Sequence, residues 1–350
     1  MKASSARSRT VAAFAVLAAL LVCAFVVGVG VGSVYISPAA VVRALTGHGN
    51  TEVDATIVRQ IRVPRSIAAA GVGTALGVAG LQLQSLFRNS LADPFVLGVS
   101  SGASFGVALV VLGATRSDVA FLGGLDALGH LGVAAAGVVG AAVTTMLVLA
   151  AARFARSAVS VLIVGLMCSY AISSFVTVLV AWADAPRVQE FLAWEAGSFR
   201  SVTWPQLRIL IPTLVVGLVA AAGVTKQLNA LLLGEQTAAT LGVDVARTRR
   251  RAITASALLV GVSTAFCGPI AFLGLGVPHL GRAALRTDDQ RLLLPASMLV
   301  GATLAILADV VTQVPGSDFT IPLNAVTALI GAPVVFGVVL RSRHAGVVGA

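Results

Sequence analysis

The chain has 350 residues, of which 57% are apolar and only 11% charged, and its mean hydropathy is +0.97. Soluble globular domains carry about 25% charged residues, so a small soluble domain, a disordered tail and a disulfide scaffold are excluded. A net charge of +10 would suggest nucleic-acid binding if it formed a surface patch, whereas in a membrane protein it reports orientation, because Lys and Arg are retained on the cytoplasmic side.

Ten apolar stretches are candidates for membrane-spanning helices, each of which needs about 20 mostly apolar residues. The first follows three basic residues and is longer than the apolar core of about 7–15 residues in a signal peptide, so we predict a retained helix. The break at Gly268-Pro269 separates two short spans, because proline interrupts a helix. The predicted spans are 11–36, 67–87, 95–114, 131–151, 159–182, 205–224, 252–267, 270–285, 292–311 and 322–340.

The basic residues test this count. With the N-terminus inside, sixteen of the 24 basic residues fall in inner segments and eight in outer ones, with none near the middle of a span. This asymmetry follows the positive-inside rule and makes nucleic acid an unnecessary partner. We therefore predict an all-α polytopic membrane protein of about ten helices with both termini cytoplasmic. Residues 1–10 and 341–350 are predicted tails, and 11–340 a single transmembrane domain.

Few polar side chains lie in the predicted spans. Ser169 and Ser173 lie on one face of the fifth span and Gln84 lies in the second, so they are candidates either for helix packing or for the wall of a pathway. Asp309 is the one acid within a span, and its place near the membrane surface favours a structural hydrogen bond over a transport role. Small residues at every fourth position predict close helix packing at Gly73, Gly77, Gly98, Gly102 and Gly106.

The sequence has no catalytic or cofactor-binding motif that we recognise. Neither Lys2 nor Lys226 ends a phosphate-binding loop, so the chain shows no means of holding ATP itself. Cys23, Cys168 and Cys267 lie apart in apolar runs, which predicts neither a metal site nor a disulfide. We predict a transport subunit rather than an enzyme, with energy supplied from outside the chain.

The longest inner segment, residues 226–251, predicts short amphipathic helices broken at Gly234 and Gly242 and followed by a basic cluster. Such a segment either touches anionic lipid or docks on another protein, and composition alone leaves both open.

Several blocks of sequence, spread over about residues 60–340, carry a more specific pattern. They are Arg62-Val63-Pro64-Arg65, Arg88-Asn89-Ser90-Leu91-Ala92-Asp93-Pro94, 97–103, Trp194-x-x-Gly197-Ser198 with Trp204, 228–251, 268–275, Val277-Pro278-His279, and Pro322 with 327–333. Together they resemble the FecCD/BtuC-like permeases, the membrane subunits of ABC importers for iron–siderophores, haem and cobalamin.

The resemblance implies a homodimer, or a pair with a sister permease, of about twenty helices in a bacterial cell membrane. It implies that ABC ATPase subunits carry the ATP and Mg, that this chain binds no cofactor or metal, and that an extracytoplasmic binding protein delivers a metal chelate. Arg62 and Arg65 would pair with acids of that binding protein, or else simply lie at the membrane surface. The implied ATPase-docking residues are Leu233, Gly234, Glu235, Thr240, Leu241, Gly242, Val243 and Asp244. The implied structural-motif residues are Asn89, Asp93, Pro94, Gly268, Pro269, Pro278 and His279.

We predict from this that the chain translocates an iron–siderophore-type chelate by alternating access, along a path at the dimer interface lined by the second and fifth helices. Cobalamin, haem and a stand-alone secondary transporter are the alternatives. The chain departs from the family pattern at Ser90, where proline is usual, and at Gln313, where an arginine is frequent. Thr320 and Asn324 replace a common Glu and Gly around Pro322, near the predicted outer mouth of the pathway.

Overall fold

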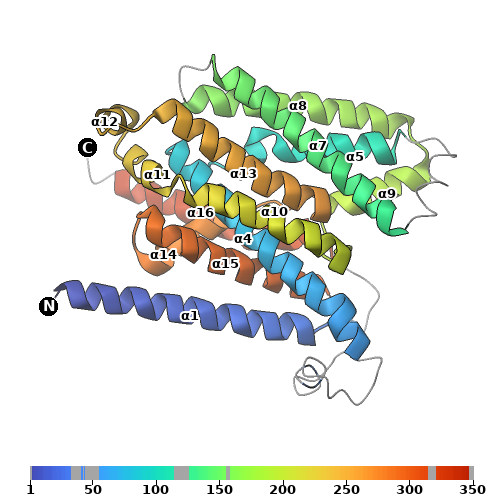
Figure 1. Cartoon of the computed structure of the whole chain (residues 1–350), viewed down its shortest axis with the longest axis horizontal. Coiled ribbons are helices and arrows are strands. Elements are labelled where there is room, and N and C mark those ends of the chain that lie inside the picture. The colour runs from blue at the N-terminus through green and yellow to red at the C-terminus, as the bar shows by residue number, and fades with distance from the viewer. Residues whose placement is uncertain are drawn as a thin grey trace.

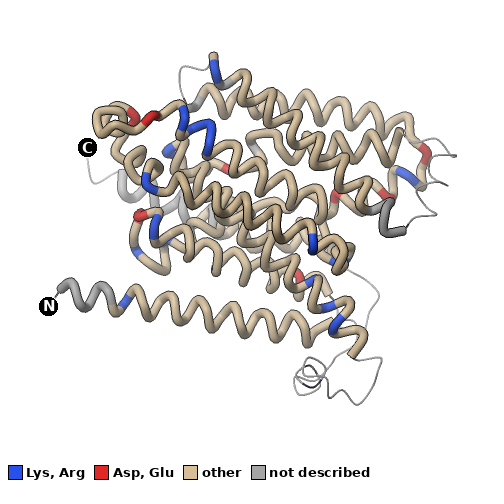
Figure 2. Tube along the Cα trace, viewed as in Figure 1, with Lys and Arg blue, Asp and Glu red and all other residues tan. Residues whose placement is uncertain are grey.

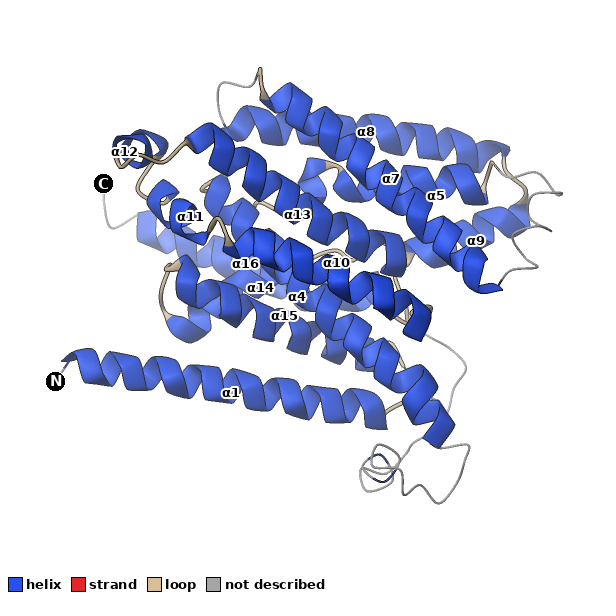
Figure 3. Cartoon of the chain, viewed as in Figure 1, coloured by secondary structure: helices blue, strands red, loops and turns tan. Residues whose placement is uncertain are grey.

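The computed structural model describes residues 2–32, 41, 43, 55–113, 126–154, 158–313 and 321–346. Every extended regular element in this part of the chain is a helix, which confirms the predicted all-α fold (Figure 3). The elements are α1 (Lys2–Gly30), η1 (Ile57–Arg62), α4 (Val63–Leu86), η2 (Pro94–Leu97), α5 (Val99–Val111), α7 (Asp126–Ala152), α8 (Ala158–Trp182), α9 (Ala185–Glu195), α10 (Trp204–Ala222), α11 (Thr225–Leu231), α12 (Glu235–Thr240), α13 (Val245–Cys267), α14 (Leu273–Leu285), α15 (Gln290–Val311) and α16 (Leu323–Gly346).

Each of the ten predicted spans coincides with one of the helices α1, α4, α5, α7, α8, α10, α13, α14, α15 and α16. Six helices are long and apolar enough to cross a membrane on their own: α1, α4 with η1, α7, α8, α10 and α15. The long helices run side by side, and α1 begins and α16 ends at the left of Figure 1. Figure 2 shows many of the basic residues gathered at that same end, near α11 and α12.

The helix α4 forms the centre of the bundle. It packs against α10, α13, α14 and α15, and most of its side chains are buried. Gly73 faces the backbone of Gly301 on α15, and Gly80 faces the carbonyl of Gly274 on α14, where an added Cβ would collide. The glycines of α4 therefore serve close helix packing. In this conformation of the single chain α4 lies at the centre of the bundle, and the prediction that the second helix lines a path at a subunit interface stays a prediction.

Two predicted boundaries change and one is confirmed. Residues 2–10 and 341–346, predicted as tails, continue α1 and α16. The break at Gly268 is present: α13 ends at Cys267, Gly268 has a φ of +72°, and α14 begins only at Leu273. The short helix α9, which was not predicted, follows α8 at the opposite end from α12 (Figure 1). Its length of only 11 residues, the proline at its second position and its three charged residues suit a helix outside the membrane.

Candidate functional site

The segment between α10 and α13 presents two leucines outside the bundle. Gly234 and Gly242 end the helical pieces with φ values of +109° and +82°, which L side chains rarely adopt. The predicted breaks are thus confirmed. Next to them, Leu233 and Leu241 are 64% and 63% exposed. Exposed large apolar side chains at a charged, water-facing end of a membrane protein suit contact with another protein.

This segment is held firmly on α13. A carboxylate oxygen of Glu235 accepts a hydrogen bond of 2.8 Å from the Arg249 guanidinium. Asp244 caps α13, because its Oδ1 accepts from the backbone N–H of Arg247 at 2.8 Å. Leu228 and Leu231 anchor α11 in the core. A push on α12 would therefore be passed to α13 through fixed contacts.

A polar hollow of about 470 Å³ opens on the face formed by α5, α8 and α9. Hydroxyl groups dominate its polar lining, and Glu195 at the end of α9 adds a carboxyl group whose pKa is raised by burial. Hydroxyls and one carboxyl can hydrogen-bond to a polar ligand without binding it tightly. The polar residues that line it are Ser100, Ser101, Ser104, Ser173, Thr177, Glu195 and Asn324.

Asn324 ties together three segments at the edge of this hollow. Its Nδ2 donates to the carbonyls of Pro269 at 2.8 Å and Glu195 at 3.2 Å, and its Oδ1 accepts from the N–H of Ala271 at 3.0 Å. The end of α9, the turn after Gly268 and the start of α16 thus meet at one side chain. A glycine at this position could make none of these bonds.

The two outer arginines predicted to meet a binding protein are buried. Arg65 donates to Oδ1 of Asp309 through Nε at 3.0 Å and Nη2 at 2.7 Å. Arg62 donates through Nη1 to the carbonyls of Val29 at 3.0 Å and Gly30 at 2.7 Å, which are among those left without partners at the end of α1. Both arginines are only 6% exposed, so neither is open at the surface of the single chain, and their docking role stays a prediction.

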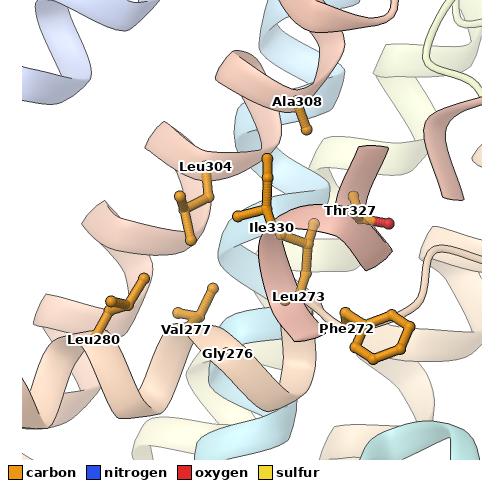
Figure 4. Close-up of a pocket in the computed structure, with 10 residues that line it drawn as sticks. Phe272, Leu273, Gly276, Val277, Leu280, Leu304, Ala308, Thr327 and Ile330 are labelled. Atoms are coloured by element: carbon orange, nitrogen blue, oxygen red, sulfur yellow. The ribbon is translucent and has the colours of Figure 1, made fainter. Parts of the chain in front are cut away.

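A second enclosed space is apolar and small. A cavity of about 20 Å³ lies among α14, α15 and α16. Figure 4 shows Phe272, Val277, Leu304 and Ile330 around it. It has room for about one water molecule and offers almost no polar partners, so it is a packing gap rather than a ligand site.

Comparisons with known proteins identify what this architecture serves. The FecCD transport family model matches residues 20–341. This chain belongs to the FecCD transport family. The vitamin B12 import system permease protein BtuC of Vibrio cholerae is 37% identical over 84% of this chain and 85% of its own length. An uncharacterised ABC transporter permease protein, YvrB of Bacillus subtilis, is 32% identical over 97% of this chain and 96% of its own. A solved structure assigned to the metal-chelate type of ABC transporter, in an inward-facing conformation, superimposes with a TM-score of 0.80 at 30% identity, covering 93% of this chain and 97% of that one.

The chain is therefore a FecCD-family permease of an ABC importer, a multi-pass bacterial membrane subunit without catalytic activity of its own. The fold and the family inferred from the sequence blocks are confirmed.

The structural-motif residues of this FecCD permease shape its turns. Asn89 Oδ1 accepts from the N–H of Leu91 at 2.9 Å, and Asp93 Oδ1 accepts from the N–H of Phe95 at 2.8 Å, which starts η2. Burial raises the pKa of Asp93. Pro94 packs against Gly274 at the start of α14.

Other motif residues lie within α14 and at the turn before it. Pro278 is buried inside α14, and Nδ1 of His279 lies 2.8 Å from the carbonyl of Leu275, one turn earlier. The carbonyl of Pro269 is the one that Asn324 holds.

The three residues predicted to line the pathway occupy different environments. Ser173 is exposed and lines the polar hollow. Ser169 lies one turn away, where its hydroxyl donates to the carbonyl of Gly165 and packs beside Gly98. Gln84 is 2% exposed; its Nε2 donates to the carbonyl of Leu275 at 3.2 Å and its Oε1 accepts from Arg282 at 2.7 Å. Gln84 joins α4 to α14 and does not face an open path in this conformation.

Sequence reasoning missed the roles of two residues that it had noticed as departures. Asn324 forms the hydrogen bonds that join α9, the turn after Gly268 and α16. Gln313 lies buried, with its Nε2 3.4 Å from Oδ2 of Asp309. An amide next to a lone acid in an apolar helix was a usable signal, since buried polar groups need partners. Thr320, the remaining departure near them, lies outside the described residues.

Proposed function

We propose that this permease imports a metal chelate, with a corrinoid such as vitamin B12 as the first candidate cargo and an iron–siderophore as the second. The observation that carries the corrinoid candidate is the likeness to permeases named for vitamin B12 import, at up to 37% identity over most of both chains. The iron–siderophore expectation rests on the family resemblance and on the solved relative of metal-chelate type.

The path for the chelate lies on the face of α8, against a second permease copy or a sister permease. In the single chain α8 is largely uncovered: Tyr170 and Phe175 are 63% and 64% exposed, and the polar hollow opens beside them. A second copy facing this hollow would roughly double its 470 Å³ and enclose it. Hydroxyl-rich walls suit a large polar cargo that must enter and leave again.

An ABC ATPase, which supplies ATP and Mg, docks on Leu233 and Leu241. These leucines are exposed at the end with the basic residues, and α12 is coupled to α13 by the Glu235–Arg249 pair. ATP-driven closure of two such ATPases would then tilt the helices and alternate access to the path. An extracytoplasmic binding protein delivers the chelate at the opposite end.

The test is reconstitution in liposomes with the ATPase and the binding protein encoded beside this permease. We expect vitamin B12 to stimulate ATP hydrolysis and to accumulate inside, and a ferric hydroxamate siderophore to do neither. Stimulation by the siderophore alone would select the second candidate. Uptake that proceeds without ATP would overturn the proposed coupling.

A control separates the path from the docking site. Ser173→Phe narrows the hollow and is expected to lower uptake while ATP hydrolysis without cargo persists. Leu233→Asp with Leu241→Asp is expected to remove both activities. Unchanged uptake by the Ser173→Phe variant would mean that α8 does not border the path, and loss of both activities would assign Ser173 to folding.

A further inference from the structure

A groove rimmed by arginines lies between the end of α10 and the start of α13. It has a volume of about 580 Å³ and is lined by Ala220 on α10, by Val224 in the turn that follows, and by three arginines on α13, Arg247, Arg250 and Arg251. Figure 1 shows α10 and α13 lying side by side, and Figure 2 shows basic residues at the left end of α13, where this helix begins. The groove thus opens at the cytoplasmic end of the bundle.

Acidic neighbours neutralise the positive charge of these three arginines only in part. Arg247 lies 3.6 Å from Asp244, and both side chains are more than half exposed. Among the described residues, neither Arg250 nor Arg251 forms an ion pair, although both are exposed. Arg250 and Arg251 follow each other in the sequence and both line the groove, so their guanidinium groups can bind an anion with several oxygens at its rim.

Below the arginines the groove becomes apolar. Thr254 and Leu258 continue the same face of α13, one and two turns further along the helix. From Arg247 to Leu258 the helix advances about 16 Å at roughly 1.5 Å per residue, which is deeper than the headgroup layer. The lower part of the groove therefore lies at the depth of the hydrocarbon.

A second apolar groove lies on the other side of these two residues, which line both grooves. It has a volume of about 250 Å³, runs between α7 and α13, and is lined by Met146, Leu149 and Val262 together with Thr254 and Leu258. Met146 is 69% exposed in the single chain. One groove with a basic rim and a second apolar groove beside it, separated by Thr254 and Leu258, match the shape of a headgroup with two acyl chains.

We propose that this site binds one acidic phospholipid of the cytoplasmic leaflet, with its phosphate on Arg250 and Arg251 and its acyl chains on either side of Leu258. A soluble ATPase could reach the arginines but not the apolar grooves below them. The bound lipid would fill the space between α10, α13 and α7 and steady the helix that carries the docking segment.

The test measures lipid retained by the full chain purified in mild detergent, by native mass spectrometry after exchange into a mixture of phosphatidylglycerol and phosphatidylcholine with equal acyl chains. The wild type is expected to retain one phosphatidylglycerol in preference to phosphatidylcholine. Arg250→Gln with Arg251→Gln is expected to weaken that retention about twenty-five-fold, because each basic residue near acidic lipid contributes about fivefold. Thr254→Phe, which fills the groove without changing charge, is also expected to lower retention.

The matched control is Arg286→Gln with Arg291→Gln, two exposed arginines at the same end but outside the groove, with the same change in charge. It is expected to retain phosphatidylglycerol as the wild type does. Equal loss from control and groove variants, or equal retention of the two lipids by the wild type, would overturn the proposal. So would normal lipid retention by the Arg250 and Arg251 double variant combined with loss of the co-purifying ATPase, which would assign these arginines to docking.

Discussion

The buried pair of Arg65 and Asp309 provides the sharpest test of how the outer end is built. The two side chains are 7% and 4% exposed, and Nε and Nη2 of Arg65 both donate to one carboxylate oxygen of Asp309, at 3.0 and 2.7 Å. Removing one partner leaves a charge buried without its counter-ion, which costs about 3–5 kcal/mol. Replacing both by apolar residues of similar size removes that penalty, and is often neutral.

We therefore expect Arg65→Met and Asp309→Leu each to lower the thermal midpoint of the full chain, purified in detergent, by about 6–10 °C, taking roughly 2 °C per kcal/mol. The double variant is expected to be more stable than either single variant. The assay is thermal unfolding followed by loss of helical circular dichroism, with all four proteins compared in the same detergent.

Arg208→Met is the matched control, because Arg208 is an exposed arginine at the same end, in the first turns of α10. Exposed substitutions usually change stability by no more than about 0.5 kcal/mol. If Arg65→Met unfolds at the temperature of Arg208→Met, the pair does not stabilise the fold. If the double variant is as unstable as the sum of the single ones, the two side chains are not coupled.

Three further outcomes follow from the structure. Leu233→Asp with Leu241→Asp should leave the thermal midpoint unchanged, because both side chains are exposed, but should abolish co-purification of the ATPase in a pull-down. Asn324→Ala removes three hydrogen bonds and should cost about 2–4 kcal/mol at roughly 1 kcal/mol each, together with faster hydrogen exchange in the turn after Gly268. Asp289 caps α15, and hydrogen bonds from the N–H of Arg291 and from Asn229 hold its pKa below the usual value. The carboxylate of Asp289 therefore contributes to the free energy of unfolding above the ordinary aspartate pKa of about 3.9, and this contribution is lost as the pH falls through the lower pKa of the folded state. Asp289→Ala should lower the free energy of unfolding by about 1 kcal/mol at pH 7 and by less at acidic pH, as measured by thermal unfolding over a pH series.

The sequence predicted the helices well because a membrane span is set by local composition. Every predicted span coincides with a helix, and the break at Gly268 was readable from glycine followed by proline. The ends were less predictable. The charged residues 2–10 continue α1, because nothing in them interrupts a helix, and the positive-inside rule locates charges without locating helix ends.

Side-chain placement was predicted less well, because it depends on which helices become neighbours. Gln84 and Ser173 looked alike as polar residues in apolar spans, yet Gln84 lies in the central helix and Ser173 on an exposed face. A single sequence shows the spacing of residues along one helix but not which helix lies at the centre. Arg65 and Asp309 are 244 positions apart, and only the packing of α4 on α15 brings them together.

The burial of Arg65 also limits how it could serve a binding protein. An exposed arginine–carboxylate pair contributes about 0–1 kcal/mol, whereas leaving Asp309 buried without its partner costs about 3–5 kcal/mol. A carboxylate on a docking protein therefore cannot withdraw Arg65 from Asp309 unless other contacts supply the difference. Arg200 and Arg208 are exposed at the same end, so their charges can steer a docking protein while the buried pair remains intact. On this reasoning, charge reversal at Arg200 and Arg208 slows association with the binding protein, while loss of Arg65 first destabilises the permease.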